Sequence, residues 1–169
     1  SAAIQCRDGR RWAMGITVTR EEAVWLRKQH PSGRIVAACG CFDIFHIGHL
    51  EYLEAAARLG DALFVGVNTD SSVYRNKGRF PYFHLRDRLR LLAALECVDY
   101  VFPFFEKSFA LALFQLRPSV LARGADASVK GFPEENVCLS LKIEVIQAGT
   151  KKRASSTQLR TTLEPDVLP

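Results

Sequence analysis

The sequence contains no long hydrophobic run: none of its apolar stretches approaches the roughly 20 residues that a membrane helix needs. The N-terminus also lacks the charged-then-apolar pattern of a secretory signal. Both absences argue against a membrane or secreted protein. We therefore expect a cytoplasmic protein without a membrane partner.

Cysteines are few and are not arranged for covalent or metal cross-linking. Of the five, only Cys39 and Cys41 lie close together in the chain. An odd number at these spacings forms neither a disulfide framework nor a set of zinc ligands. Reduced thiols are the simplest interpretation, which agrees with a cytoplasmic protein.

Basic residues are not gathered into one run, although the net charge is +5. Local groups occur at 7–11, 86–90 and 151–153, whereas a nucleic-acid binder usually concentrates its basic residues on one face or in a run. Solvated surface charge accounts for most of them, and the charge of a nucleotide or sugar phosphate explains the rest. We expect a small anionic substrate and no nucleic acid.

The remaining composition is that of one globular domain. Hydrophobic residues make up 48% of the 169 residues, a length that fits a single domain. We expect an irregular, polar segment at 1–18, one domain at 19–163 and a tail or linker at 164–169. Because the chain starts with serine and its one methionine is Met14, either further sequence precedes it or it is cut from a longer protein.

Local patterns predict helices and strands in alternation. Thr19 and Glu22 form a capping box that begins a short helix, which stops before Pro31. Compact apolar runs predict strands at 34–39, 62–67, 99–102, 119–122 and 143–146. Helical patterns predict further helices at 49–59, 86–96, 109–116, 134–141 and 155–163. Residues 68–85, rich in turn formers and aromatics, are expected to form a long functional loop.

This alternation predicts a doubly wound α/β domain with a Rossmann-like parallel sheet, because right-handed crossovers place helices on both faces. Ligands of such sheets bind beyond the carboxyl ends of the strands. The loops after residues 39, 67, 122 and 147 are therefore expected to meet around one crevice.

The segment from Gly40 to His49 carries the chemistry. Gly40 lets the backbone turn closely against a ligand, and His46 and His49 lie three residues apart with Gly48 between them. If a helix begins near residue 47, both imidazoles face one side of its N-terminus, where unpaired N–H groups and a positive partial charge attract phosphate. Two histidines there can donate to phosphate oxygens during an in-line displacement. Incidental surface or capping histidines are the alternative.

This segment resembles the HxGH signature of the cytidylyltransferase-like nucleotidyltransferase superfamily, and the resemblance runs from about Arg34 to Leu163. The stretch GCFDIFHIGHLEYLEAAARLGDALFVGVNTDSSVYRNKG is most similar to the adenylyltransferase domain of bacterial ADP-heptose synthesis enzymes. Glycerol-phosphate and ethanolamine-phosphate cytidylyltransferases are similar too, but typically carry Thr or Val where this chain has Cys41. Class I aminoacyl-tRNA synthetases share the HIGH string, but they need further domains for which this chain is too short.

The resemblance implies roles for individual residues. The catalytic set that it implies is His46, His49 and Lys77, the lysine acting as a mobile point charge for phosphate. The implied nucleotide-binding residues are Gly40, Cys41, Phe42, Gly48, Arg123, Arg153, Ser155, Ser156 and Thr157. The implied acceptor-binding residues are Asp70, Tyr82, His84 and Arg88. Asp43 is expected to orient the loop through backbone hydrogen bonds.

Some of these residues also have plainer interpretations, and the resemblance has departures. Lys77 could be a surface lysine, and the hydroxyls at 155–157, which match the family's Ser-Thr-Thr only as hydroxyls, could be an ordinary helix cap. Heptose-type enzymes usually have Lys-Gly-Gly-Asp-Tyr where this chain has Arg-Gly-Ala-Asp-Ala at 123–127. The aromatic cluster at 80–84 is expected to contact the acceptor, with packing against the domain as the alternative.

Together these features predict a nucleotidyltransferase that moves a nucleoside monophosphate from ATP or CTP to a small phosphorylated acceptor, with pyrophosphate release. A sugar 1-phosphate is the leading acceptor and Mg²⁺ the expected cofactor, with no metal ligand assigned. The first alternative is a CTP-dependent cytidylyltransferase acting on a polyol phosphate, an amino-alcohol phosphate or a hydroxyalkylphosphonate. The second is an inactive nucleotide- or RNA-binding module. A homodimer and a place in a larger bifunctional protein both remain open.

Overall fold

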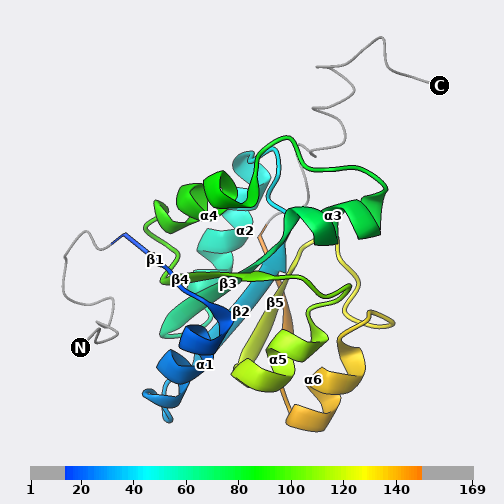
Figure 1. Ribbon diagram of the computed structural model, residues 1–169. Helices are drawn as coiled ribbons and strands as arrows, with labels where there is room; N and C mark the ends of the chain where they lie inside the picture. Colours follow the sequence, from blue (N-terminus) through cyan, green and yellow to red (C-terminus); the bar gives the residue numbers. More distant parts are fainter. Residues whose placement is uncertain (1–13, 150–169) are drawn as a thin grey trace.

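A six-stranded parallel sheet organises residues 14–149, the part of the chain that the computed structural model describes (Figure 1). The strands follow the spatial order β1-β4-β3-β2-β5-β6. Their bounds are β1 Ile16–Thr17, β2 Ile35–Gly40, β3 Ala62–Asn68, β4 Tyr100–Phe104, β5 Val120–Gly124 and β6 Glu144–Ala148. Because β3 pairs with one side of β2 and β5 with the other, the winding reverses at β2, where sheets of this kind bind ligands.

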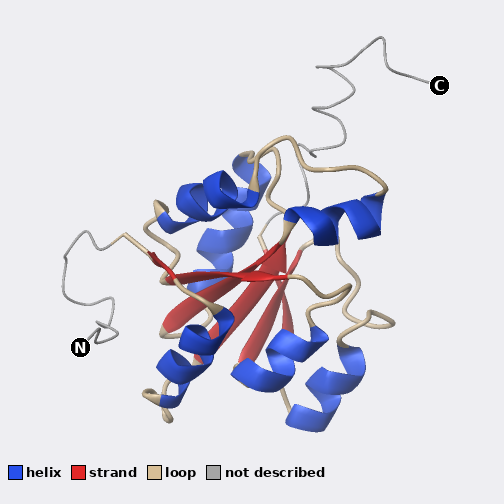
Figure 2. Cartoon of the chain, in the orientation of Figure 1, coloured by secondary structure: helices blue, strands red, loops and turns tan. Residues whose placement is uncertain are grey.

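Helices cover both faces of the sheet (Figure 2). One face carries α1 Arg20–Lys28, α5 Ala110–Leu116 and α6 Glu135–Leu141. The other carries α2 Ile47–Ala57 and α4 Leu85–Ala93, while α3 Asp70–Lys77 lies beyond the carboxyl end of β3. This is the doubly wound α/β class expected from the sequence.

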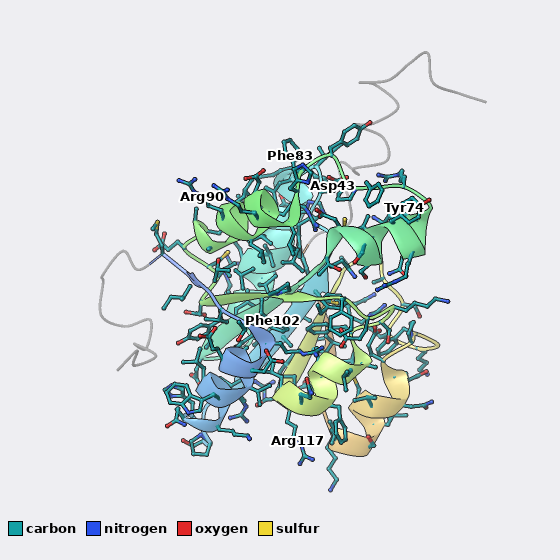
Figure 3. The ribbon with its side chains drawn as sticks, viewed as in Figure 1. Asp43, Tyr74, Phe83, Arg90, Phe102 and Arg117 are labelled. Atoms are coloured by element: carbon teal, nitrogen blue, oxygen red, sulfur yellow. The ribbon has the colours of Figure 1, made fainter. Side chains whose placement is uncertain are left out.

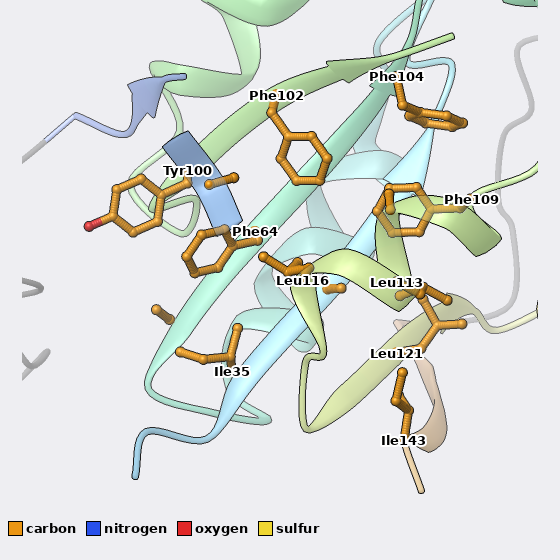
Figure 4. Packing of buried hydrophobic residues seen from close by; sticks show 14 of the residues in the cluster. Ile35, Phe64, Tyr100, Phe102, Phe104, Phe109, Leu113, Leu116, Leu121 and Ile143 are labelled. Carbon is orange, nitrogen blue, oxygen red and sulfur yellow. The ribbon is translucent and has the colours of Figure 1, made fainter. Parts of the chain in front are cut away.

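Each face of the sheet has its own apolar core, because alternate residues of a strand point to opposite sides. On the α1 side, aromatic rings pack closely: Phe64 and Tyr100 have centroids 4.6 Å apart, and Phe104 and Phe109 5.0 Å apart (Figure 4). On the α2 side the core is mostly aliphatic, with Leu53 and branched residues of the strands, and Phe42 is its one buried aromatic ring among the described residues. Burial on both faces explains why β2 and β3 read as nearly unbroken apolar runs.

The first helix begins and ends where the sequence predicts. The Thr19 hydroxyl accepts a hydrogen bond from the Glu22 N–H at 3.1 Å, and the Glu22 carboxylate accepts one from the Thr19 N–H at 2.7 Å. This reciprocal capping box satisfies two donors that a helix start leaves unpaired. The helix then ends at Lys28, ahead of Pro31.

The prediction of a long loop over 68–85 is wrong, because α3 occupies its first half. The turn-forming residues there are helix caps. The Thr69 hydroxyl accepts from the Ser72 N–H at 3.2 Å, and Gly78 ends the helix in the left-handed conformation, with φ of 70°. A short helix with one buried apolar residue, Val73, shows too little hydrophobic periodicity to be recognised.

The N-terminal segment 1–18 is not wholly irregular either. Ile16 and Thr17 form β1, which pairs in parallel with Tyr100 and Val101 of β4 at the edge of the sheet. The predicted helix at 155–163 and the tail at 164–169 lie outside the described residues. Within the described range, no helix has the length and apolar character required to cross a membrane.

The packing of the core on the α1 side predicts that a larger residue cannot replace Gly66, the β3 residue on which the Phe109 ring rests. A Cβ added at Gly66 would lie 2.2 Å from a carbon of that ring, and Phe109 is 1% exposed, so the ring has no room to move. We expect Gly66→Ala to lower the free energy of unfolding by about 1–3 kcal/mol, the usual cost of overpacking. Urea denaturation monitored by circular dichroism measures this change.

Gly33→Ala is the matched control, since a Cβ at that position meets its nearest atoms at an ordinary 3.5 Å. The two variants add the same methyl group, one to the core and one to a surface turn. Equal unfolding free energies for both would contradict the packing described for Phe109.

Candidate active site

A crevice of about 300 Å³ opens beyond the carboxyl ends of β2 and β5, where the winding of the sheet reverses. Three of the four expected loops line it: those that follow residues 39, 122 and 147. The segment after residue 67 does not line this crevice. It approaches the β2 loop instead through Asp70, at the start of α3.

The start of α2 points its backbone donors into this region. His46 is the N-cap, in extended conformation, and its Nδ1 accepts a hydrogen bond from the Gly48 N–H at 3.1 Å. A neutral imidazole that accepts at Nδ1 carries its proton on Nε2. The cap therefore fixes the tautomer and leaves Nε2–H as the donor that His46 can offer to a phosphate oxygen.

The two histidines of the motif lie against each other. The rings of His46 and His49 are stacked with centroids 3.9 Å apart and planes 23° apart. Phe42 meets the His49 ring edge-on at 5.3 Å, and Phe45 contacts it at 5.5 Å. This geometry agrees with the expectation that both imidazoles lie on one side of the helix start. Both residues also line the crevice.

The backbone between β2 and α2 is strained at Phe42. This residue has φ of 48°, in the left-handed region that non-glycine residues rarely adopt, and it is 4% exposed. Its ring folds back over Gly40, where a Cβ would lie 3.0 Å from the ring. A glycine at this position thus leaves room for the Phe42 ring. Gly40 also lines the crevice, and its close approach to a ligand stays a prediction. Strain of this kind persists when the surrounding contacts hold it.

Asp43 anchors a distant loop to the motif, as expected. Its buried carboxylate accepts hydrogen bonds from the N–H groups of Tyr82, at 2.7 Å, and Phe83, at 3.2 Å, and lies 3.8 Å from the Arg79 guanidinium. Asp43 and Phe83 can be followed at this edge of the molecule in Figure 3. The loop at 79–84 is thus held beside the strained turn, although 40 residues separate Asp43 from Phe83.

Arg88 forms hydrogen bonds to three separate segments: the turn after β2, the start of α3 and the loop at 79–84. The side chain is 2% exposed and its guanidinium donates to the carbonyls of Cys41, at 2.6 Å, and Phe83, at 3.0 Å, and to the Asp70 carboxylate at 2.6 Å. Three of the five guanidinium donors are thus engaged by the protein itself. Contact of Arg88 with an acceptor, as implied by the resemblance, stays a prediction.

The other predicted acceptor-binding residues lie close to this network and reach solvent. Asp70 also faces His84, with Nδ1 and the carboxylate oxygen 3.4 Å apart, and the His84 side chain is 88% exposed. Tyr82 and Phe83 are 45% and 53% exposed. Asp43 and Arg88 hold the loop backbone, while Phe80 stacks on Tyr74 of α3 with ring centroids 4.6 Å apart. The aromatic cluster is thus partly packed against the domain and partly exposed, and its contact with an acceptor stays a prediction.

Lys77 ends α3 and is exposed. Its charge acts on Cys41 of the motif: burial raises the pKa of the Cys41 thiol, and Lys77 is the strongest of the neighbouring cations that oppose this rise. The lysine is therefore near the β2 loop, although it does not line the crevice beside the histidines.

The β5 side of the crevice is built around Arg123, Glu134 and Phe132. The Arg123 guanidinium lies 4.1 Å from the centre of the Phe132 ring and 3.4 Å from the Glu134 carboxylate. Tyr52 forms part of the lining, and its hydroxyl donates to the Ala122 carbonyl at 2.9 Å. Burial raises the pKa of Tyr52 well above its ordinary value. Sequence patterns did not single out Tyr52 or Glu134, because each is one residue of an ordinary helical segment.

The structure thus brings Gly40, Cys41, Phe42, His46, Gly48 and His49 together around α2, with Arg123 in the same crevice. It gathers Asp70, Tyr82, His84 and Arg88 at the neighbouring loop. The remaining predicted nucleotide-binding residues, Arg153, Ser155, Ser156 and Thr157, lie outside the described part of the chain.

Comparison with known proteins agrees with this architecture. The family model described as cytidylyltransferase-like matches residues 37–162. The bifunctional protein HldE of Citrifermentans bemidjiense is 40% identical over 126 residues, which are 72% of this chain and 26% of HldE. HldE of Streptomyces coelicolor is 48% identical over 113 residues, covering 66% of this chain and 24% of the relative. The chain thus spans about a quarter of the length of these relatives.

A solved structure is similar as well. The lipopolysaccharide core biosynthesis protein from Thermoplasma volcanium superposes with a TM-score of 0.61 at 28% identity, covering 72% of this chain and all of that chain. The family match covers the strained turn, the histidine pair and the loop that Asp43 and Arg88 hold. The chain belongs to the cytidylyltransferase-like family of nucleotidyltransferases.

Proposed function

We propose that this domain transfers a nucleoside monophosphate from ATP or CTP to a small phosphorylated acceptor, with a sugar 1-phosphate as the leading acceptor, and releases pyrophosphate. The observation that carries the proposal is the stacked pair of His46 and His49 at the N-terminus of α2. An oxygen of the acceptor phosphate attacks the α-phosphorus, and the bond from the α-phosphorus to the bridging oxygen breaks. Negative charge then builds on the departing pyrophosphate.

The protein's part in this reaction is to hold and stabilise phosphate. The N–H groups at the start of α2 and its positive end bind phosphate oxygens. The Nε2–H of His46 donates to an oxygen whose charge increases in the transition state, and His49, stacked on it, lies where it can contact the same phosphate chain. No side chain needs to form a covalent intermediate, because phosphoryl-type transfer depends mostly on position and charge.

Acceptor binding falls to the loop that the motif holds in place. Asp43 and Arg88 fix the backbone around Phe83, and Tyr82 and His84 project from it into solvent beside the motif. Lys77 is the cation for the phosphates at this end. The similarity to HldE and to a lipopolysaccharide core biosynthesis protein supports a sugar phosphate as acceptor.

Mg²⁺ is proposed to enter with the nucleotide. Magnesium in such sites is usually held by one or two carboxylates together with substrate phosphates. Residues 14–149 contain no group of three or more His, Cys, Asp or Glu that could hold a metal ion by themselves, and Asp126 lines the crevice with one carboxylate. When bound, the ion would offset part of the triphosphate charge.

Two alternatives differ from this proposal, one in the substrates used and the other in the absence of turnover. A CTP-dependent enzyme for a polyol phosphate, an amino-alcohol phosphate or a hydroxyalkylphosphonate would use the same residues, and an inactive nucleotide- or RNA-binding module would bind without turnover. A pyrophosphate-release assay with four NTPs and a panel of phosphorylated acceptors distinguishes all three. Release in no combination would leave the inactive module as the explanation.

We also propose that the domain belongs to a larger bifunctional protein, because its HldE relatives are about four times longer than the matched region.

Replacing either motif histidine tests the catalytic proposal. We expect His46→Ala or His49→Ala to lower kcat by about 10²–10³-fold, the scale of losing one donor to the transition state. Steady-state pyrophosphate release measures it, with His30→Ala, a surface histidine beyond α1, as the control. Turnover close to that of the unmodified protein in both motif variants would rule out the proposed role.

Lys77→Ala tests whether this lysine contributes to turnover rather than to stability. Lys77 is exposed, so the melting temperature should stay within error of the unmodified protein while turnover falls. Parallel thermal melts and kinetics give the answer, and Lys107→Ala is a control of the same charge change on a loop after β4. Unchanged kinetics would show that Lys77 is an ordinary surface lysine.

The acceptor loop is tested by replacing Tyr82 and His84 together with alanine. Both side chains project from a backbone that Asp43 and Arg88 hold, so their removal should leave the loop in place. We expect a higher KM for the acceptor and a nearly unchanged Kd for the NTP, measured by kinetics and calorimetry. A weaker NTP affinity with an unchanged acceptor KM would assign the loop to the nucleotide instead.

A further inference from the structure

Arg123 is a half-buried cation with few hydrogen-bond partners in the crevice. Its side chain is 20% exposed, and it leaves the carboxyl end of β5 to join the lining that includes His46 and His49. A guanidinium has five N–H donors. In the described residues one donor, at Nη1, makes a hydrogen bond, and at 3.4 Å to Glu134 that bond is long.

The remaining donors of Arg123 make no hydrogen bond within residues 14–149. Nε is buried and makes no hydrogen bond to a described residue. Burying a donor of a charged group without a partner is costly, and such groups are rare unless a ligand or a function explains them. An anionic oxygen in the crevice would supply what the guanidinium lacks.

Glu134 is placed by the core rather than by Arg123. Its carboxylate accepts a hydrogen bond from the buried Phe109 N–H at 2.8 Å, and its side chain is 9% exposed. The Phe109 ring in turn rests on Gly66 in the centre of the sheet. The acid therefore stands at a fixed point, and its second oxygen is left to orient Arg123.

Phe132 restricts the guanidinium from another side. The ring is 7% exposed and its centre lies 4.1 Å from the central carbon of Arg123, within the range of a cation–π contact. A ring and a carboxylate together limit the directions in which the planar group can turn. Such restriction lowers the entropy cost of forming a hydrogen bond to a ligand.

We propose that Glu134 and Phe132 are positioning residues that direct Arg123 toward a phosphate oxygen in the crevice. This inference rests on the proposed function, since it assumes phosphorylated substrates there. The phosphate belongs either to the triphosphate of the nucleotide or to the acceptor. Glu134 balances the buried charge while the crevice is empty, and its long contact with Arg123 leaves the guanidinium able to bind both the acid and the ligand.

Binding measurements test the proposal without requiring turnover. Calorimetric titrations use inorganic tripolyphosphate for the nucleotide phosphates and a hexose 1-phosphate for the acceptor. Arg123→Lys keeps the charge and loses the planar fork, so we expect one of the two Kd values to rise about 10-fold to 100-fold, the scale of a hydrogen bond to a charged group. The probe that responds identifies the source of the phosphate.

Glu134→Gln tests the positioning role. We expect it to weaken the same probe about 3-fold to 10-fold, and to add little in the double variant with Arg123→Lys, because residues that act through one another are not additive. If Glu134→Gln does not fold, Phe132→Leu takes its place. Arg34→Lys and Glu144→Gln are matched controls, since they form a half-exposed ion pair at the opposite end of the strands.

Three results would overturn the inference. They are unchanged affinity for both probes in Arg123→Lys, full additivity of the two substitutions, and no binding of either probe by the unmodified protein. If the proposed function itself is wrong, the result is different: tripolyphosphate binds in an Arg123-dependent way, but no combination of NTP and acceptor gives pyrophosphate release. In that case the inference about Arg123 stands and the reaction does not.

Discussion

The buried guanidinium of Arg88 is the contact on which the arrangement of the site depends. It joins the carbonyl of Cys41, the carbonyl of Phe83 and the carboxylate of Asp70, which belong to three separate segments of the chain. A guanidinium that is 2% exposed must keep its partners, because a buried charge without them is strongly destabilising. The turn after β2, the start of α3 and the loop at 79–84 are therefore held as one unit, and Asp43 adds a second connection between the first and the last.

The same unit explains how a strained turn can persist. Phe42 keeps φ of 48° because its ring is packed over Gly40 and against His49, while the carbonyl just before it is held by Arg88. The turn leads directly into α2, where His46 caps the helix and stacks on His49. The strained residue, the helix cap and the histidine pair thus lie together at the reversal point of the sheet.

Much of the fold could be predicted from the sequence because its signals are local. Apolar runs marked β2 and β3, the capping box marked α1, and alternation of helices and strands implied a parallel sheet. The failures have equally local causes. The helix α3 buries one apolar side chain and begins and ends with residues that also form turns, while β1 is two residues long and exists through its pairing with β4.

By itself the sequence determined the family, the Rossmann-like sheet and the histidine pair, because the HIGH string and its strand-to-helix setting occupy adjacent positions. Tertiary structure decided what each residue faces. It turned Arg88 inward to bind two backbone carbonyls and a carboxylate, packed the Phe42 ring over Gly40, and set Glu134 and Phe132 around Arg123. These contacts join residues that lie far apart in the chain or depend on how a side chain packs, and no spacing in a single sequence records the direction in which a side chain points.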